Sequence, residues 1–393
     1  MRTKGIRSMD FTVFSFAMAV VWTGIFAKLI SVLRKRMSIL QYFSVYPLLI
    51  LLLFCILRII LPLELPYTIV IKSENIVPMV QDFFRTPFIR LGNIHISLML
   101  LISIIWILGA IVILLRRLWN YYHFKRFLNF LPASEDKRLY HFVKKADTYG
   151  RLHHVKIIVR SEVESPAIVG CIHPVVLLPK IAFEDDELLG IFVHEISHYT
   201  YKHHFIKLIA EFISICFWWN PLFRTLSAET AHTLEMHSDK AVCSRLNAVQ
   251  QKKYIDGIVK VISNKKYNNI APSFSNSLVE EMDTEKLQQR FHMILGNYYQ
   301  NKRKAHFVIL PFILSIFLLS YAVVIQPYSE PEASDYEEGM EIPDEDCGLY
   351  FVKTKDGYDL YLYPEKFIDH MDEIQDTLQK LRVYSSTEEA NKK

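Results

Sequence analysis

The stretch HISLMLLISIIWILGAIVILL, residues His95–Leu115, decides the fold of this chain because it contains no Asp, Glu, Lys or Arg. A helix that crosses a membrane needs roughly 20 predominantly apolar residues. Apolar residues make up 51% of the 393-residue chain, and they are clumped rather than spread evenly. Four stretches predict transmembrane helices: Phe11–Leu33, Phe43–Leu63, His95–Leu115 and Phe307–Ile325.

Two of these predicted spans carry a charged residue. Lys28 and Arg58 must snorkel or face other helices, because a charge at the bilayer centre costs about 2.5 to 3.5 kcal/mol. The first span has a rival interpretation as a signal peptide, since Ala17-Met18-Ala19 loosely fits a cleavage site. The apolar run continues beyond it to Arg34-Lys35-Arg36, which is typical of a retained anchor.

The basic residues beside the spans predict their orientation, because cytoplasmic flanks are enriched in Lys and Arg. The basic clusters follow the first and third spans and precede the fourth: Arg34–Arg36, Arg116-Arg117, Lys125-Arg126 and Lys302–Lys304. Beyond the fourth span, Tyr328–Asp346 is acidic and has no Lys or Arg, as suits the exterior. The residues Arg2, Lys4 and Arg7 oppose this orientation, and the three internal regions outvote them.

This topology predicts a multi-pass, mainly α membrane protein in four parts. Residues 1–117 hold three transmembrane helices with short loops, residues 118–304 a cytoplasmic α+β domain, residues 305–326 the fourth helix, and residues 327–393 a small extracellular α+β domain. The membrane flanks explain the net charge of +4, so we expect no direct contact with nucleic acid. The five cysteines show no C-x-x-C spacing and predict no disulfide framework.

Within the cytoplasmic part, the sequence predicts a charged helix at Pro132–Tyr149 and short strands within Val155–Pro179. Acidic residues at Glu184–Glu187 predict the first turn of a further helix. Phe205–Trp219 is apolar but too short to span a membrane. It is either a membrane-skimming or re-entrant helix, or a buried core helix, and the sequence leaves both open.

Two further segments have simple interpretations. Asn264–Asn276 is polar and reads as an exposed loop. In the tail, Leu349–Leu362 predicts a hairpin with Asp356-Gly357 at its turn, followed by a helix near Phe367–Leu381.

The motif that carries chemistry is H-E-x-x-H, at His194-Glu195-Ile196-Ser197-His198. Two histidines four residues apart lie on one face of a helix, where they can bind one tetrahedral zinc ion. Glu195 lies one position round the helix and can reach a metal-bound water. Such a site needs a third protein ligand and an open position. Glu235 is our candidate, with Asp239 four residues later on the same helical face to orient a ligand histidine, for which we favour His194.

The chain resembles the beta-lactam sensor-transducer family of membrane zinc peptidases. The matching pieces, in order along the first 325 or so residues, are Ser165–Gly170 with Pro174–Pro179, His194–His198, Trp219–Leu222 and Glu235–Val242. The resemblance implies a gluzincin-type (zincin-like) peptidase domain between the third and fourth transmembrane helices. Ser238 stands where the family commonly has Cys. The residues after Ile325 are too few for the family's external penicillin-binding domain, and the S-x-x-K match at Ser263–Lys266 is a chance one, so direct beta-lactam sensing is not expected.

The resemblance also implies a reaction and partners. Glu195 is the expected general base of a zinc endopeptidase that cleaves itself or a cytoplasmic winged-helix transcriptional repressor after an external signal. Ser273-Phe274 is the expected self-cleavage site. The strand near Val175–Leu178 either offers an edge for an extended substrate or is a plain core strand. Membrane lipid and a second copy of the chain, as a homodimer, complete the expected partners.

The residue that stabilises the oxyanion stays open among several near the motif: Tyr199, Tyr201, His203, His204, His232 and His237. We interpret His203-His204 as a solvated helix end rather than as extra ligands. Two rival functions share the same residues. One is a general membrane quality-control metalloprotease, and the other is a non-enzymatic receptor with a structural zinc site, against which Glu195 argues because a structural site needs no base.

Overall fold

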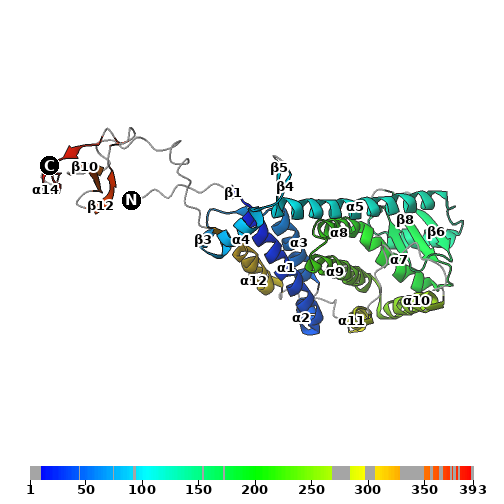
Figure 1. Ribbon diagram of the computed structural model, residues 1–393. Coiled ribbons are helices and arrows are strands. Elements are labelled where there is room, and N and C mark those ends of the chain that lie inside the picture. Colours follow the sequence, from blue (N-terminus) through cyan, green and yellow to red (C-terminus); the bar gives the residue numbers. More distant parts are fainter. Residues whose placement is uncertain are drawn as a thin grey trace. The chain divides into compact units, whose positions relative to one another are not determined.

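The computed structural model describes residues 10–43, 45–73, 75–91, 94–152, 155–170, 173–267, 284–296, 306–327, 349–354, 357–362, 366–371, 374, 378 and 381–390. It divides into two compact units, Met1–Pro327 and Tyr328–Lys393. Helices dominate the first unit, in agreement with the predicted mainly α class (Figure 1). The predicted self-cleavage site Ser273-Phe274 and the acidic stretch Tyr328–Asp346 lie outside the described residues.

Among the described residues, α1 (Val13–Lys35) and α5 (Leu98–Phe130) are the two helices that are long and apolar enough to cross a membrane. α3 (Tyr46–Ile60) and α12 (His306–Leu319) coincide with the other two predicted spans but are shorter. The structure therefore supports two spans by length and composition, and the four-span topology with its sidedness stays a prediction.

α5 continues far past the predicted third span, which ended at Leu115. The following residues to Phe130 contain no Gly or Pro, so nothing stops the helix until Leu131, which precedes Pro132. The helix begins where the Ser97 hydroxyl accepts a hydrogen bond from the Leu100 N–H at 3.2 Å. α5 is thus one continuous helix that contains the predicted third span and extends 15 residues beyond it.

The charged residues of the first two spans have different surroundings. Arg58 on α3 is fully buried, with its guanidinium 4.1 Å from the centre of the Tyr321 ring and a hydrogen bond of 3.2 Å to the Ser320 carbonyl. It therefore faces protein, one of the two predicted solutions. Lys28 on α1 is exposed.

α1 is the centre of the helical packing in the first unit. It contacts α3 and α9 (Pro221–Arg245), and α3 in turn contacts α12. Small elements complete this part of the unit: α2 (Met37–Phe43), α4 (Ile76–Arg85), β1 (Asp10–Phe11), β2 (Leu63–Glu64), β3 (Ile69–Ser73), β4 (Pro87–Leu91), β5 (Ile94–Ser97) and β9 (Val323–Pro327).

The segment between α5 and α12 contains a three-stranded sheet in the order β6 (Lys156–Arg160), β8 (Val175–Pro179) and β7 (Ala167–Val169). β8 pairs in parallel with β6 and antiparallel with β7. The prediction that Val175–Leu178 offers a free edge is therefore wrong, because both edges of this strand are paired. Its continuous apolar run, almost entirely buried, is typical of a central strand. β7 is the edge strand instead.

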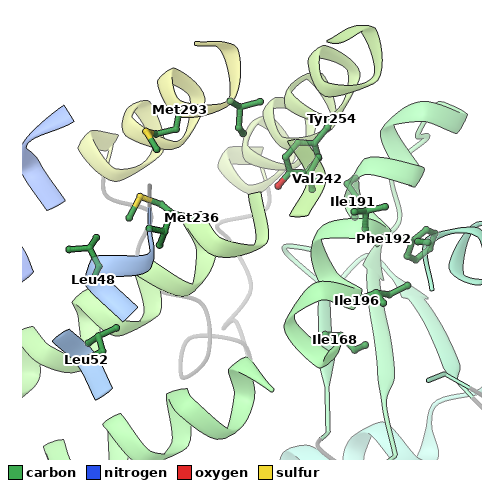
Figure 2. Close-up of a cluster of buried hydrophobic side chains, with 14 of the residues drawn as sticks. Leu48, Leu52, Ile168, Ile191, Phe192, Ile196, Met236, Val242, Tyr254 and Met293 are labelled. Atoms are coloured by element: carbon green, nitrogen blue, oxygen red, sulfur yellow. The ribbon is translucent and has the colours of Figure 1, made fainter. Parts of the chain in front are cut away.

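Helices surround this sheet and enclose one large hydrophobic core. The predicted charged helix is α6 (Lys137–Ala146), and the others are α7 (Asp185–Thr200), α8 (His203–Cys216), α9, α10 (Ala248–Tyr267) and α11 (Thr284–Leu295). Figure 2 shows side chains of α7, α9, α10 and α11 in this core, together with Leu48 and Leu52 of α3. The helices around the sheet and the apolar helices α1 and α3 therefore share one core.

The second unit is a four-stranded sheet in the order β12-β11-β10-β13. Its strands are β10 (Leu349–Lys353), β11 (Tyr358–Leu362), β12 (Lys366–Met371) and β13 (Val383–Tyr384), with the short helix α14 (Thr387–Ala390). The predicted hairpin of β10 and β11 is confirmed. The helix predicted from Phe367 is wrong at its start, because β12 pairs antiparallel with β11 and the Phe367 ring lies edge-on to Tyr361 at 5.6 Å.

Candidate metal centre

α7 presents the two motif histidines on one face. Its first turn is acidic, which complements the helix dipole, and the Glu184 N–H donates to the Glu187 carboxylate at 2.8 Å. Four residues apart, His194 and His198 come to lie one above the other, each only 5% exposed. Their Nε2 atoms are 3.2 Å apart.

α9 brings the distant carboxylate to this pair. The helix begins with Pro221 at its first position and the Asn220 side chain accepting from the Leu222 N–H at 3.0 Å. Fourteen positions into the helix, Glu235 places Oε2 3.1 Å from Nε2 of His194 and Oε1 3.5 Å from Nε2 of His198. One potential ligand atom from each of the three residues lies within 4.8 Å of the other two.

These separations fit a metal ion. Ligand atoms about 2.0 to 2.1 Å from a tetrahedral zinc are about 3.3 Å from one another. Nε2 of His194 lies 3.2 Å from Nε2 of His198 and 3.1 Å from Oε2 of Glu235, and the other Glu235 oxygen, Oε1, lies 3.5 Å from Nε2 of His198, all close to that value. Two imidazoles and one carboxylate are also the donor set of a catalytic zinc site with one open position. The residues present therefore fit the predicted zinc ion.

The outer nitrogen of His194 is held by a buried network. The structure brings Asp239 to it, as the sequence suggested, with Oδ1 3.1 Å from Nδ1. The Tyr254 hydroxyl is 2.9 Å from both of these atoms, and the Arg290 guanidinium donates to both oxygens of Asp239 at 2.7 and 2.9 Å. A carboxylate only accepts hydrogen bonds, so Nδ1 of His194 carries a hydrogen, and Nε2 is the nitrogen that can exchange its proton for a cation.

The outer nitrogen of His198 is held by another histidine. His203 is only 1% exposed, and its Nδ1 is 3.0 Å from Nδ1 of His198. Nε2 of His203 is in turn 3.0 Å from Nδ1 of His237. The interpretation of His203 as part of a solvated helix end is therefore wrong. α8 follows α7 after a short turn at Lys202, in the left-handed conformation, and this turn folds His203 back beneath the motif.

Glu195 is anchored to the edge strand. Its Oε2 accepts the backbone N–H of Ile168 in β7 at 3.1 Å, and Nε2 of His204 donates to the carbonyl of the same residue at 2.6 Å. Burial raises the pKa of Glu195 to about 7. A carboxylate with such a pKa is poised to accept and return a proton near neutral pH.

The electrostatics of the other residues suit a cation site. Burial alone would raise the pKa of Glu235, but the charge of Lys207, 3.0 Å away, and His198 hold it well below its usual value. Burial lowers the pKa of His198 to about 3, which keeps that ring neutral. Burial also lowers the pKa of His194, but the hydrogen bonds with Asp239 and Glu235 outweigh it and raise the pKa to about 9. The two carboxylates thus favour positive charge at His194.

The site opens into a cavity of about 810 Å³ that is bounded by β7, α5 and the helices from α7 to α11. Of the six residues considered for the oxyanion, His204 and His232 line this cavity, whereas the others do not. Sequence reasoning missed Lys207, Tyr254 and Arg290, which also line it. No spacing rule pointed to Tyr254 or Arg290, since they belong to helices that follow the motif at variable distance.

A membrane-bound metallopeptidase is the class that these features indicate: apolar helices long enough to cross a bilayer, a shared core, and two histidines with a carboxylate at tetrahedral spacing. Comparison with known proteins agrees. Residues 32–294, more than half of the chain, match the family described as BlaR1 peptidase M56. The chain therefore belongs to this family, whose members are membrane metalloproteases of signal transduction.

Individual relatives are regulatory proteins. The chain is 31% identical over 179 residues to "Regulatory protein BlaR1" of Bacillus licheniformis, over 44% of this chain and 30% of the relative. It is 23% identical over 288 residues to "Regulatory protein BlaR1" of Staphylococcus aureus, over 67% of this chain and 47% of the relative. It is also 23% identical over 187 residues to "Methicillin resistance mecR1 protein" of Staphylococcus aureus (strain Mu50), over 44% and 31%. The chain thus spans less than half the length of these relatives.

Proposed function

We propose that this chain is a zinc-dependent endopeptidase that transmits a signal across a membrane by cleaving itself or a transcriptional repressor. The observation that carries the proposal is the convergence of His194, His198 and Glu235 at tetrahedral spacing, with Glu195 beside them. Membership of the BlaR1 peptidase M56 family supports it, and favours it over a general quality-control protease.

In this proposal, Nε2 of each motif histidine and the Glu235 carboxylate hold one zinc ion. When bound there, zinc supplies the Lewis acidity for peptide hydrolysis. Asp239 fixes the hydrogen of His194 on its outer nitrogen and keeps the ring oriented, and Arg290 in turn fixes the Asp239 carboxylate. Arg290 also lies 3.5 Å from Glu235, so the same guanidinium contacts both the Asp239 and the Glu235 carboxylates.

Glu195 is the general base. It takes a proton from the attacking water and returns it to the leaving amine. The Ile168 N–H holds its carboxylate at the edge strand, so that the base and the backbone beside the substrate are placed by the same residue. For the oxyanion, the candidates are Lys207, a cavity-lining cation 3.0 Å from Glu235, and His204, which also lines the cavity.

A physical connection between the first apolar helix and the site supports a transducing role. Arg34, near the end of α1, is 3% exposed and pairs with Glu229 of α9 at 2.5 Å. It also donates to the Gln289 side chain of α11 at 3.0 Å. Gln289 is adjacent to Arg290, the partner of Asp239. A shift of α1 would therefore displace the residues that orient His194.

The proposed topology keeps the peptidase domain cytoplasmic and the tail outside. The repressor is proposed because the relatives are named as regulatory and resistance proteins. Self-cleavage at Ser273-Phe274 is supported by the chain order alone: these residues follow α10 and precede α11, and both helices line the cavity.

The test uses the full chain purified from membranes and loaded with zinc, with a co-expressed candidate repressor. Mass spectrometry follows the size of both proteins. We expect Glu195→Gln to keep its zinc but to cleave about 10²- to 10⁴-fold more slowly than the parent, because it lacks the base. Glu135→Gln, an exposed carboxylate outside the cavity, is the matched control and should cleave as the parent does. Equal cleavage by the parent and Glu195→Gln would refute the proposed mechanism.

A further inference from the structure

α8 has two faces of opposite character. Lys207, Glu211 and Ser214 point to the cavity beside the metal centre. On the opposite side, three large apolar side chains of α8 are exposed, together with one in the turn that leads to α9 and one in the first turn of α9. We call these residues the α8 apolar face: Phe205 (61% exposed), Leu208 (54%), Phe212 (54%), Trp219 (51%) and Leu222 (39%).

The turn between α8 and α9 lies against the middle of the apolar helix α5. Trp106 donates its ring N–H to the Cys216 carbonyl, and the Trp218 ring N–H donates to the Trp106 carbonyl at 3.1 Å. The Trp218 ring also lies against Gly109, where a Cβ atom would be 2.6 Å from it. Trp106 precedes Arg116 by ten residues, or about 15 Å of helix. This is roughly half of the ~30 Å hydrocarbon thickness of a bilayer.

The same turn also lies against the apolar middle of α1. The Phe217 ring stacks on Phe16 with their centres 6.0 Å apart, and Leu222 packs on Gly24. Gly24 lies ten residues, or about 15 Å, before Arg34, and the nearer Lys28 is exposed and can snorkel. Two independent helices thus place the turn at membrane depth.

We propose that α8, the turn and the first part of α9 form a re-entrant hairpin that enters the bilayer, with the α8 apolar face in contact with lipid acyl chains. α8 lies along α5 (Figure 1), and no residue in the most apolar part of α5 is fully buried by protein. The lipid that surrounds the apolar part of α5 therefore also contacts the α8 apolar face. A re-entrant helix is one of the two interpretations that the sequence left open for Phe205–Trp219. The exposed side chains of the α8 apolar face exclude the other interpretation, a fully buried core helix.

The backbone and charges of the hairpin are compatible with this position. Irregular backbone is tolerated at membrane depth only where protein satisfies its polar groups. Here the Cys216 carbonyl accepts from Trp106, the Asn220 side chain caps α9, and Arg224 donates to the Trp218 carbonyl at 3.2 Å. Glu211 pairs with Arg117 of α5 at 3.2 Å, and its side chain lines the cavity rather than the apolar face.

The hairpin would leave a single helix between the cavity and the lipid. Its placement does not depend on whether the chain hydrolyses peptides, because it follows from packing against α1 and α5 alone. It does require that α5 crosses the membrane.

Photocrosslinking tests the proposal. The photoreactive analogue p-benzoylphenylalanine is introduced at Phe205 or at Phe212 of the full chain, which is reconstituted in vesicles of phosphatidylethanolamine and phosphatidylglycerol. Leu108, in the apolar part of α5, is the positive control site, and Tyr149, 57% exposed in the soluble domain, is the negative one. After irradiation, intact-mass spectrometry detects the attached partner.

We expect the chains labelled at Phe205, Phe212 and Leu108 to gain the mass of one phospholipid, and the chain labelled at Tyr149 to gain none. A lipid adduct from Leu108 but not from Phe205 or Phe212 would overturn the proposal. So would a crosslinked dimer as the main product at Phe212, because this would assign the face to a second copy of the chain.

Discussion

α7 and α8 are consecutive helices rich in apolar residues, yet they use those residues in opposite ways. On α7, Phe192, Val193 and Ile196 are buried in the core, and only a few side chains of the helix are not (Figure 2). On α8, Phe205, Leu208 and Phe212 are exposed. Both helices carry residues of the metal centre. α7, which holds the motif, is therefore fixed by packing against other protein side chains. The apolar side chains of α8 need lipid around the protein to cover them.

The largest effect is expected where the α7 histidine meets its buried carboxylate. Asp239→Ala breaks the ion pair between a fully buried carboxylate and the largely buried guanidinium of Arg290, which among the described residues keeps only the Glu235 carboxylate at 3.5 Å, and should destabilise the fold by about 3 to 5 kcal/mol. Urea unfolding in nanodiscs measures the free energy. Asp185→Ala removes an exposed ion pair with Arg138 and should cost only about 0 to 1 kcal/mol. Similar costs for the two variants would contradict the buried network.

The second expected effect concerns the contact between α8 and the end of the α7 motif. His203→Ala removes the hydrogen-bond partner of His198 and should weaken zinc binding about 10- to 100-fold. A competition titration with a zinc chelator measures the affinity. His141→Ala, at an exposed position on α6, is the control. If both variants bind zinc like the parent, His203 does not position the ligand.

A third, smaller effect tests how tightly α7 is packed. A Cβ atom at Gly190 would lie 2.6 Å from the Cβ of Tyr254, a buried residue. Overpacking costs about 1 to 3 kcal/mol of folding stability, and the higher helix propensity of Ala offsets about 1 kcal/mol of this cost. Gly190→Ala should therefore lower the melting temperature, whereas Gly257→Ala, whose nearest neighbours are at 3.3 Å, should leave it nearly unchanged. The reverse order would show that α10 does not hold α7.

The smallest effect is expected on the α8 apolar face. Phe212→Ala should change the stability in a bilayer by less than about 1 kcal/mol, because no protein cavity is created. Phe192→Ala on α7, fully buried, should cost about 3 to 5 kcal/mol. Unfolding of both variants in the same nanodiscs makes the comparison. A loss above 2 kcal/mol for Phe212→Ala would mean that protein, not lipid, covers this face.

The residues that the sequence placed correctly beside one another have fixed helical spacing. His194 and His198, and Glu235 and Asp239, each lie four residues apart, so one helical turn determines their common face. The approach of Glu235 to the histidines came from the motif and the family resemblance, and the structure brings them together.

The parts that sequence reasoning missed depend on tertiary packing. Arg290 reaches Asp239 from α11 across a connection that no periodicity describes. His203 looked solvent-facing because polar residues often end helices, but the turn at Lys202 buries it. Phe367 lies in a strand because the neighbouring β11 provides a partner, which local propensity does not record.

The zinc content of the purified chain tests the central claim most directly. Metal analysis combined with chelator competition should find one zinc ion per chain, and Glu235→Ala should bind it far more weakly while Glu135→Ala binds it normally. If Glu235→Ala retained zinc as tightly as the parent, the carboxylate of α9 would not be a ligand, and the proposed site would be contradicted.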